Sequence, residues 1–240
     1  YGLLSAEGGR FVAVRSSATH EDDEAQSAAG LYETFLGVAG EDALLDAIRG
    51  VWASLYAPRV ITYLRALGVR PGKSQPIGVG VVVQALVRAD AAGVMFTVNP
   101  LSGDTGEIVI NASYGLGTAV VDGSVSPDTF RIDKVSGWVK DRVIGDKAHQ
   151  LQVDENRLIR HETRPGDRER ESISSNVIAD LSALALRIEH TFGSARDVEW
   201  ALAGETLYVL QARPVTALPS AGKKVRPRRI RDRSKTVWSN

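Results

Sequence analysis

The segment DVEWALAGETLYVLQARPV, residues 197–215, constrains the possible folds of this chain more than any other stretch. Two runs of alternating apolar and polar residues flank a turn expected at 204–206, and this pattern is typical of a β-hairpin. Alternation places Glu199 on one face of the first strand and Trp200 on the other. With the turn at that position, Glu199 is predicted to lie opposite Gln211 on the returning strand.

The two faces of this hairpin differ in character. The predicted polar face carries Asp197, Glu199, Gln211 and Arg213, and the predicted apolar face carries Trp200, Leu202, Tyr208 and Leu210. Mg²⁺ takes hard oxygen ligands and shares its shell with substrate phosphates, while arginine neutralises charge on transferring phosphoryl oxygens. The polar face therefore suits a magnesium-bound phosphate. An amphipathic hairpin with a merely solvated polar face is the alternative that this pattern leaves open.

A second candidate phosphate contact follows the valine-rich strand FVAVR at 11–15. Arg15 ends this buried strand, so its guanidinium is held rigidly, which favours bidentate contact with phosphate. Downstream, Gly30 lies in a run of small residues whose backbone N–H groups can fold over phosphates. A structural ion pair of Arg15 with Glu21 or Asp22 is the alternative interpretation.

The order of the remaining elements predicts an α+β fold of antiparallel strands and segregated helices. Apolar periodicity predicts strands at 11–15, 32–38, 77–87, 92–99, 106–115, 128–133 and 137–144, and helices within 41–67 and 173–192. Pro58 should divide the first helical segment in two. The apolar residues at helical spacing are Leu44, Leu45, Ile48, Trp52, Leu55, Tyr56 and Val60 in the first segment and Val177, Leu181, Leu184, Ile188 and Phe192 in the second. The segments 69–76 and 145–171 are expected to be loops.

Composition and motif searches argue against several functional classes. The formal net charge is zero, which disfavours a general nucleic-acid binder, and no run of 18 apolar residues predicts a membrane span. The absence of cysteine excludes disulfides and thiolate metal sites and fits a cytoplasmic protein. There is no P-loop and no GxSxG motif, the four histidines lack metal-ligand spacing, and the GLG at 115–117 is favoured as a tight turn.

Several stretches in fixed order resemble one family. They are VAVRSSATHED followed by AGLYETFLGV, AGVMFTVNPLSGD, INASYGLGTAVVDGSVSPDTFRIDK and ARDVEWALAGETLYVLQARPVT. Together they are similar to the nucleotide-binding domain of phosphoenolpyruvate synthase (pyruvate, water dikinase), a domain shared with pyruvate phosphate dikinase and the rifampicin phosphotransferases. The resemblance covers residues 1–217, and 218–240 are expected to form a basic linker to a following domain.

The resemblance implies an ATP-grasp fold, in which ATP lies with Mg²⁺ between two α+β lobes. It also implies that ATP phosphorylates a histidine on a separate swivelling domain, which then serves a substrate domain where pyruvate becomes phosphoenolpyruvate. Carried onto this chain, Arg15 and Arg213 contact the ATP phosphates as catalytic residues, and Glu199 and Gln211 hold Mg²⁺. The resemblance further assigns Gln84, Ala85 and Leu86 to the adenine hinge, and Gly30 and Thr34 to the phosphate-covering loop.

The chain departs from the family pattern at three places. EDDEAQSAAGLY replaces the usual EDLPDASFAGQQ of the acidic loop, which puts closure of that loop over ATP in question. Thr118 stands where a glutamate is usual after the GLG turn. The family's N-terminal segment with its ATP-binding lysine is not matched, so we expect a fragment that is inactive alone. The alternatives are the ATP domain of a rifampicin-type drug phosphotransferase and a non-catalytic nucleotide-binding module.

Overall fold

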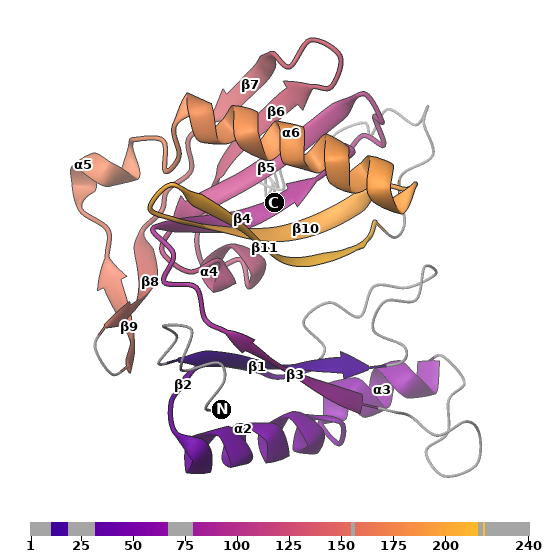
Figure 1. Ribbon diagram of the computed structural model, residues 1–240, viewed down its shortest axis with the longest axis vertical. Coiled ribbons are helices and arrows are strands. Elements are labelled where there is room, and N and C mark those ends of the chain that lie inside the picture. Colours follow the sequence, from indigo (N-terminus) through magenta and orange to yellow (C-terminus); the bar gives the residue numbers. More distant parts are fainter. Residues whose placement is uncertain (1–10, 19–31, 67–78, 155–156, 216–217, 219–240) are drawn as a thin grey trace, which may run out of the picture.

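A computed structural model of the chain describes residues 11–18, 32–66, 79–154, 157–215 and 218 (Figure 1). Most of the strands belong to two separate antiparallel sheets. One is three-stranded, with the order β2-β1-β3, and the other is six-stranded, with the order β11-β10-β4-β5-β6-β7. The result is the expected mixture of antiparallel strands and segregated helices. Among the helices that the structure describes, none is long and apolar enough to cross a membrane.

The three-stranded sheet is covered by helices on one face only (Figure 1). Its elements are β1 (Val12–Ala18), β2 (Thr34–Val38), β3 (Val79–Ala85), α2 (Glu41–Ser54) and α3 (Pro58–Ala66). Along β1, Val12 and Val14 are fully buried in a cluster with residues of α2. Because side chains alternate between the faces of a strand, Ala13 and Arg15 point the other way, toward the larger sheet. This alternation leaves Arg15 free to serve a site between the sheets.

The helices occur where periodicity predicts them, and they bury part of each predicted stripe. The expected division at Pro58 is confirmed, since α3 begins there. Of the first stripe, Val60 is buried and Leu44 and Ile48 pack on the core. The prediction is wrong for Leu45, Trp52 and Tyr56, whose exposed fractions are 45%, 51% and 78%. The residues of α2 that are buried are Ala47, Val51 and Ser54. These small residues have the helical spacing i, i+4, i+7, and they let α2 lie close to the sheet.

The six-stranded sheet packs its main core against α6 (Figure 1). Its elements are β4 (Ala91–Phe96), β5 (Glu107–Tyr114), β6 (Asp128–Asp133), β7 (Val139–Val143), β10 (Arg196–Ala203), β11 (Thr206–Pro214) and α6 (Ser175–Phe192). Met95, Phe130 and Trp200 are fully buried beneath α6. The short helix α4 (Thr118–Val121) lies on the opposite side of the sheet, facing the smaller sheet (Figure 1).

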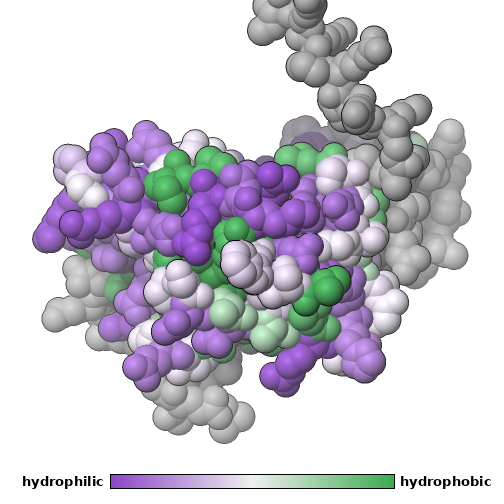
Figure 2. All heavy atoms as spheres, turned by 90° about the horizontal axis from the view of Figure 1, so that it is seen from above, coloured by the Kyte–Doolittle hydropathy of each residue, from purple (hydrophilic) through white to green (hydrophobic). Residues whose placement is uncertain are grey.

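Helix α6 begins two residues later than expected, and its predicted apolar stripe faces the core except at Phe192. Ser174 caps its N-terminus by accepting a hydrogen bond from the Val177 backbone N–H at 3.4 Å. Its buried residues are Ile178, Leu181, Ser182, Ala185 and Ile188. Phe192 is 53% exposed, and the Arg196 guanidinium lies over its ring at 4.4 Å. Figure 2 shows that the surface on this side of the molecule is largely hydrophilic, with small separate apolar patches.

The segment 145–171, expected to be loops, contains regular structure. It forms the hairpin β8 (His149–Asp154) and β9 (Arg157–Glu162) and the short helix α5 (Pro165–Arg168). The hairpin is held by a parallel bridge between Gly115 and Leu151, in which the Leu116 N–H donates to the Leu151 carbonyl at 2.8 Å. A Cβ on Gly115 would lie 2.3 Å from that carbonyl oxygen, so the expected tight GLG turn with close backbone packing is confirmed.

A fully buried ion pair anchors the same segment to the sheet. The Lys147 ammonium donates to Asp128 Oδ1 at 2.6 Å, and both side chains have no exposed surface. Lys147 also donates to the carbonyls of Gly145 and Arg168, each at 3.0 Å. Asp128 Oδ2 accepts two hydrogen bonds at 2.7 Å from the backbone and hydroxyl of Ser172. The pair thus joins β6 to the start of the loop that precedes α6.

Candidate functional site

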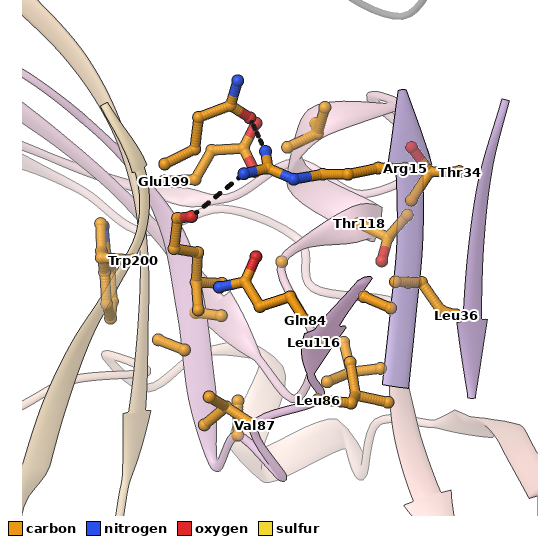
Figure 3. Close-up of a pocket in the computed structure, with 18 of the residues that line it drawn as sticks. Arg15, Thr34, Leu36, Gln84, Leu86, Val87, Leu116, Thr118, Glu199 and Trp200 are labelled. Atoms are coloured by element: carbon orange, nitrogen blue, oxygen red, sulfur yellow. Dashed lines mark hydrogen bonds between the residues drawn. The ribbon is translucent and has the colours of Figure 1, made fainter. Parts of the chain in front are cut away.

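A pocket lies between the two sheets (Figure 3). Residues of β1, β2 and β3 line it on one side, and residues of β4, α4, β10 and β11 line it on the other. Of the predicted site residues, the structure brings together Arg15, Thr34, Gln84, Ala85, Leu86, Glu199, Gln211 and Arg213 in its wall. Gly30, the acidic run after Ala18 and the alternative ion-pair partners Glu21 and Asp22 lie outside the described residues. So do residues 219–240 of the predicted linker at 218–240.

The predicted pairing of Glu199 with Gln211 is confirmed, although the turn and the returning strand differ from the expected ones. The turn is one residue shorter than expected, because Ala203 already pairs with Thr206. A β-bulge at Leu210 restores the register, since Trp200 pairs with Val209 while Glu199 pairs with Gln211. Without the bulge, Gln211 would point toward the core under α6.

The bulge also corrects the predicted faces of the last strand. Leu210 was expected on the core face, but it lines the pocket and packs near Ala201. Tyr208 pairs with Ala201, and directly paired residues share a face, so Tyr208 also lies on the pocket side of the sheet. Leu207 and Ala212 pack on the core instead. The simple alternation rule fails here because it assumes an unbroken strand.

Charged and amide groups gather at one end of the pocket. Arg15 donates from Nη1 to Gln211 Oε1 and from Nη2 to the Leu210 carbonyl at 3.5 Å, which links β1 to β11 (Figure 3). Arg213 donates from Nε to Asp197 Oδ2 at 2.9 Å, and its Nη2 lies 4.0 Å from Glu199 Oε1. This end therefore holds two guanidinium groups and two carboxylates in contact with one another.

The environment favours the neutral forms of both carboxyl groups. Burial raises the pKa of Glu199, although the positive charges of Arg213 and Arg15 oppose the shift. Burial also raises the pKa of Asp197, against the effect of Arg213. A cation added near these groups would offset the cost of their burial. The arrangement is therefore receptive to a divalent cation that arrives with its own anionic ligand.

Two buried polar atoms without hydrogen-bond partners also indicate a site for a phosphate and a metal ion at this end of the pocket. Within the described residues, Arg15 Nε and Asp197 Oδ1 are buried without a hydrogen-bond partner. The first is a donor suited to a phosphate oxygen, and the second is an acceptor suited to a metal-bound water. The described part of the chain has no cluster of three or more histidine, aspartate or glutamate side chains for a metal. The donor set of Glu199 and Gln211 fits Mg²⁺, which keeps several ligands from water and phosphates.

The other end of the pocket is apolar and suits a flat ring system. Leu36, Leu86, Val87, Ala89, Ala92 and Leu116 belong to one hydrophobic cluster there. The Leu86 backbone N–H already donates to the Phe11 carbonyl at 3.0 Å. Leu86 therefore has only its carbonyl to offer a ring edge. Gln84, near the end of β3, projects its amide into the pocket (Figure 3).

Two residues at or beside the pocket were not among the predicted site residues. Asp197 holds Arg213, and the signal for this was present, because Asp197 shares the predicted polar face of the hairpin. Gly93 lines the pocket at a point where β4 and β5 approach closely. A Cβ on Gly93 would lie 1.9 Å from the Asn111 carbonyl oxygen. A glycine inside a strand pattern is the sequence signal for such an approach. Thr118 also lines the pocket, with no carboxylate in its place.

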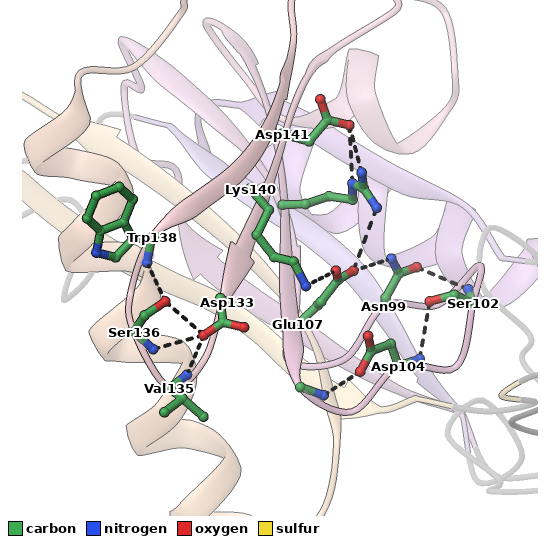
Figure 4. A network of polar contacts seen from close by, with 12 residues as sticks. Asn99, Ser102, Asp104, Glu107, Asp133, Val135, Ser136, Trp138, Lys140 and Asp141 are labelled. Carbon is green, nitrogen blue, oxygen red and sulfur yellow. Dashed lines mark hydrogen bonds and ion pairs between the residues drawn. The ribbon is translucent and has the colours of Figure 1, made fainter.

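A second polar network, centred on Glu107, serves a different purpose (Figure 4). The Glu107 side chain accepts from Lys140 at 2.7 Å and from Asn99 at 2.8 Å, and Arg131 lies 3.9 Å away. The hydrogen bonds from Lys140 and then Asn99 lower the pKa of Glu107. Because these charges are matched within β5, β6 and β7, the network is structural.

Comparison with known proteins supports a nucleotide site. Residues 2–234 match the family described as pyruvate phosphate dikinase, AMP/ATP-binding domain. The chain is 41% identical over 211 residues to the probable phosphoenolpyruvate synthase of Methanothermobacter thermautotrophicus, covering 88% of this chain and 30% of that protein. It is 38% identical over 226 residues to the probable phosphoenolpyruvate synthase of Archaeoglobus fulgidus, covering 93% and 30%.

A relative with a different name is similar to this chain to the same degree. The prodigiosin synthesizing transferase PigC of Serratia marcescens is 40% identical over 209 residues, covering 87% of this chain and 23% of that protein. The chain therefore spans less than a third of the length of each of these curated relatives.

Proposed function

Because the chain belongs to the pyruvate phosphate dikinase AMP/ATP-binding domain family, we propose that its pocket binds Mg·ATP between the two lobes of an ATP-grasp fold. The observation that carries the proposal is the polarity of the pocket. Its apolar end suits adenine, and its opposite end presents Arg15, Glu199, Gln211 and Arg213 to a polyphosphate. The three-stranded sheet with α2 and α3 is one lobe, and the six-stranded sheet with α6 is the other.

The proposed roles follow from the chemistry of each group. The Leu86 carbonyl accepts a hydrogen bond from the adenine amino group, and Gln84 and Ala85 complete that wall. Arg15 and Arg213 bind the phosphates and neutralise charge as the phosphoryl group leaves. Glu199 and Gln211 would hold Mg²⁺, which would supply positive charge to the phosphates when bound. Thr34 and Gly30 belong to the segment that covers the phosphates.

The proposed reaction is in-line transfer of a phosphoryl or pyrophosphoryl group from ATP to a histidine on a separate swivelling domain. A phosphorus–oxygen bond of ATP breaks and ADP or AMP leaves, a phosphorus–nitrogen bond forms as the imidazole gives up its proton, and the arginines stabilise the charge that develops on the phosphates. A substrate domain then uses the phosphohistidine to convert pyruvate to phosphoenolpyruvate. The names of the archaeal relatives support pyruvate as the acceptor. The histidine domain and the substrate domain would both belong to a longer protein located in the cytoplasm.

A different acceptor is the second candidate, and one observation favours it. The chain is nearly as similar to a prodigiosin synthesizing transferase as to a probable phosphoenolpyruvate synthase, at 40% against 41% identity. Similarity in this domain therefore does not select the acceptor. A drug phosphotransferase of the rifampicin type shares the same nucleotide chemistry and differs only after the histidine. A non-catalytic nucleotide-binding module would bind ATP without forming phosphohistidine.

The test is calorimetric titration of Mg·ATP into the protein and two pairs of variants. Glu199→Ala and Arg213→Ala should each lose binding, because each removes a group at the polyphosphate end. Glu205→Ala and Arg196→Ala are matched controls on the same hairpin and lie outside the pocket wall, so they should bind like the parent. Parent-like binding by Glu199→Ala and Arg213→Ala would sink the site assignment. Phosphohistidine on the full-length protein, detected by mass spectrometry, separates an enzyme from a binding module.

A further inference from the structure

Arg15 is bonded to one of the oxygen atoms that are proposed to hold the metal. Its Nη1 donates to Gln211 Oε1, and its Nη2 donates to the Leu210 carbonyl on the neighbouring residue. Figure 3 shows Glu199 on the same side of the pocket as this guanidinium. The charges of Arg213 and then Arg15 lower the pKa of Glu199 against the effect of burial. Arg15 thus bonds to one proposed metal ligand and acts on the other through its charge.

A metal ion and this guanidinium are electrostatic competitors at Gln211. An amide oxygen has two lone pairs, but a divalent cation on one of them would face the Arg15 charge bonded to the other. Like charges at such short range in a partly buried site repel strongly. Arg15 also carries an unpartnered, buried Nε–H, so it has an unused donor for an anionic oxygen. A phosphate that attracts Arg15 would release Gln211 for the metal.

From this geometry we infer that Arg15 is a positioning residue that holds Gln211 beside Glu199 by substituting for the metal, so that Mg²⁺ enters together with the nucleotide rather than before it. The inference rests on the proposed function, because it takes Glu199 and Gln211 as the metal pair. It adds an order of events and a second role for Arg15 besides phosphate binding. It also makes Arg15 the side chain that joins the two lobes across the pocket.

The two roles of Arg15 predict opposite effects of one substitution. Arg15→Gln removes the charge, so Mg·ATP binding should weaken while binding of Mn²⁺ alone should strengthen. A hydrogen bond to a charged group corresponds to a factor of about ten or more in an equilibrium constant, so a gain of about tenfold in Mn²⁺ affinity is expected. A merely structural role for Arg15 would weaken both. Mn²⁺ affinity is measured by electron paramagnetic resonance of the free ion, without nucleotide.

Arg213→Gln is the matched control, because it also removes one positive charge near Glu199. Arg213 does not bond to Gln211 among the described contacts, so its loss should change Mn²⁺ affinity by less than about threefold. Equal gains in the two variants would show a general charge effect and overturn the inference, as would no gain in Arg15→Gln. If that variant does not fold, Arg15→Met replaces it, and its Mn²⁺ affinity must rise because it also removes the charge.

The measurements keep this inference separate from the proposed function. Failure of the parent protein to bind Mg·ATP contradicts the proposed function, whatever the metal data show. Parent-like Mn²⁺ affinity in a folded Arg15→Gln variant, with Mg·ATP binding intact in the parent, contradicts only the role assigned to Arg15.

Discussion

Replacing Lys147 by methionine is expected to lower the free energy of unfolding by about 3–5 kcal/mol, because it leaves the buried Asp128 carboxylate without its counter-charge. The ammonium makes three hydrogen bonds at 2.6, 3.0 and 3.0 Å, and neither partner of the ion pair has exposed surface. Asp128 keeps its donors from Gly145 and Ser172, so hydrogen bonding persists but charge balance is lost.

Urea denaturation followed by circular dichroism measures this change, and the slope of the transition must stay constant for the comparison to hold. In thermal unfolding the same loss corresponds to a decrease in Tm of about 6–20 °C for a chain of this size. Lys134→Met is the matched control. Lys134 also has an N–O distance of 2.6 Å, to Glu189, but these side chains are 13% and 27% exposed. The control should therefore cost only about 0.2–1 kcal/mol.

A double-mutant cycle tests the cause rather than only the size. Asp128→Asn alone leaves a buried ammonium unpaired, whereas Asp128→Asn with Lys147→Met removes both charges. The double variant should be more stable than Lys147→Met alone, because no uncompensated charge remains. The reasoning is refuted if Lys147→Met costs no more than Lys134→Met, or if the two single losses simply add.

Two other predictions concern the larger sheet. Gly93→Ala should cost about 3 kcal/mol or more, because its Cβ would meet the Asn111 carbonyl at 1.9 Å and backbone atoms cannot move aside easily. Chemical denaturation checks this, with Gly166→Ala as the neutral control, since nothing lies within 4 Å of a Cβ there. Glu107→Gln should lower Tm at pH 7, and the difference should shrink as pH falls from the ordinary carboxyl range through the lowered pKa of Glu107, because a carboxyl with a lowered pKa stabilises the fold only while it is ionised. A Tm difference that stays constant throughout the acid titration would contradict that explanation.

The parts of the fold that could be predicted from the sequence are those encoded by nearest-neighbour patterns. β6 spans the expected residues 128–133, and the division at Pro58 follows from the missing N–H of proline. The pairing of Glu199 with Gln211 was predicted correctly because two errors cancel, a turn one residue too long and a strand without its bulge. These features depend on residues close together in the chain.

The features that were missed depend on long-range packing. The buried face of α2 is made of Ala47, Val51 and Ser54, and nothing local distinguishes these small residues from exposed ones. The β8–β9 hairpin has only a short apolar alternation, Leu151 and Val153 on β8, and it is positioned by the bridge from Leu151 to Gly115. The pairing of Lys147 with Asp128 spans 19 residues of chain, and sequence periodicity carries no information about such a contact.

The bulge at Leu210 has a consequence for insertions and deletions during evolution. Leu210 is the extra residue between the Trp200–Val209 and Glu199–Gln211 pairs, so deleting it alone would leave Gln211 opposite Glu199. A residue inserted at the tip would lengthen the turn without moving either pair. Relatives can therefore differ in hairpin length at the tip or at the bulge while Gln211 and Arg213 stay on the pocket face.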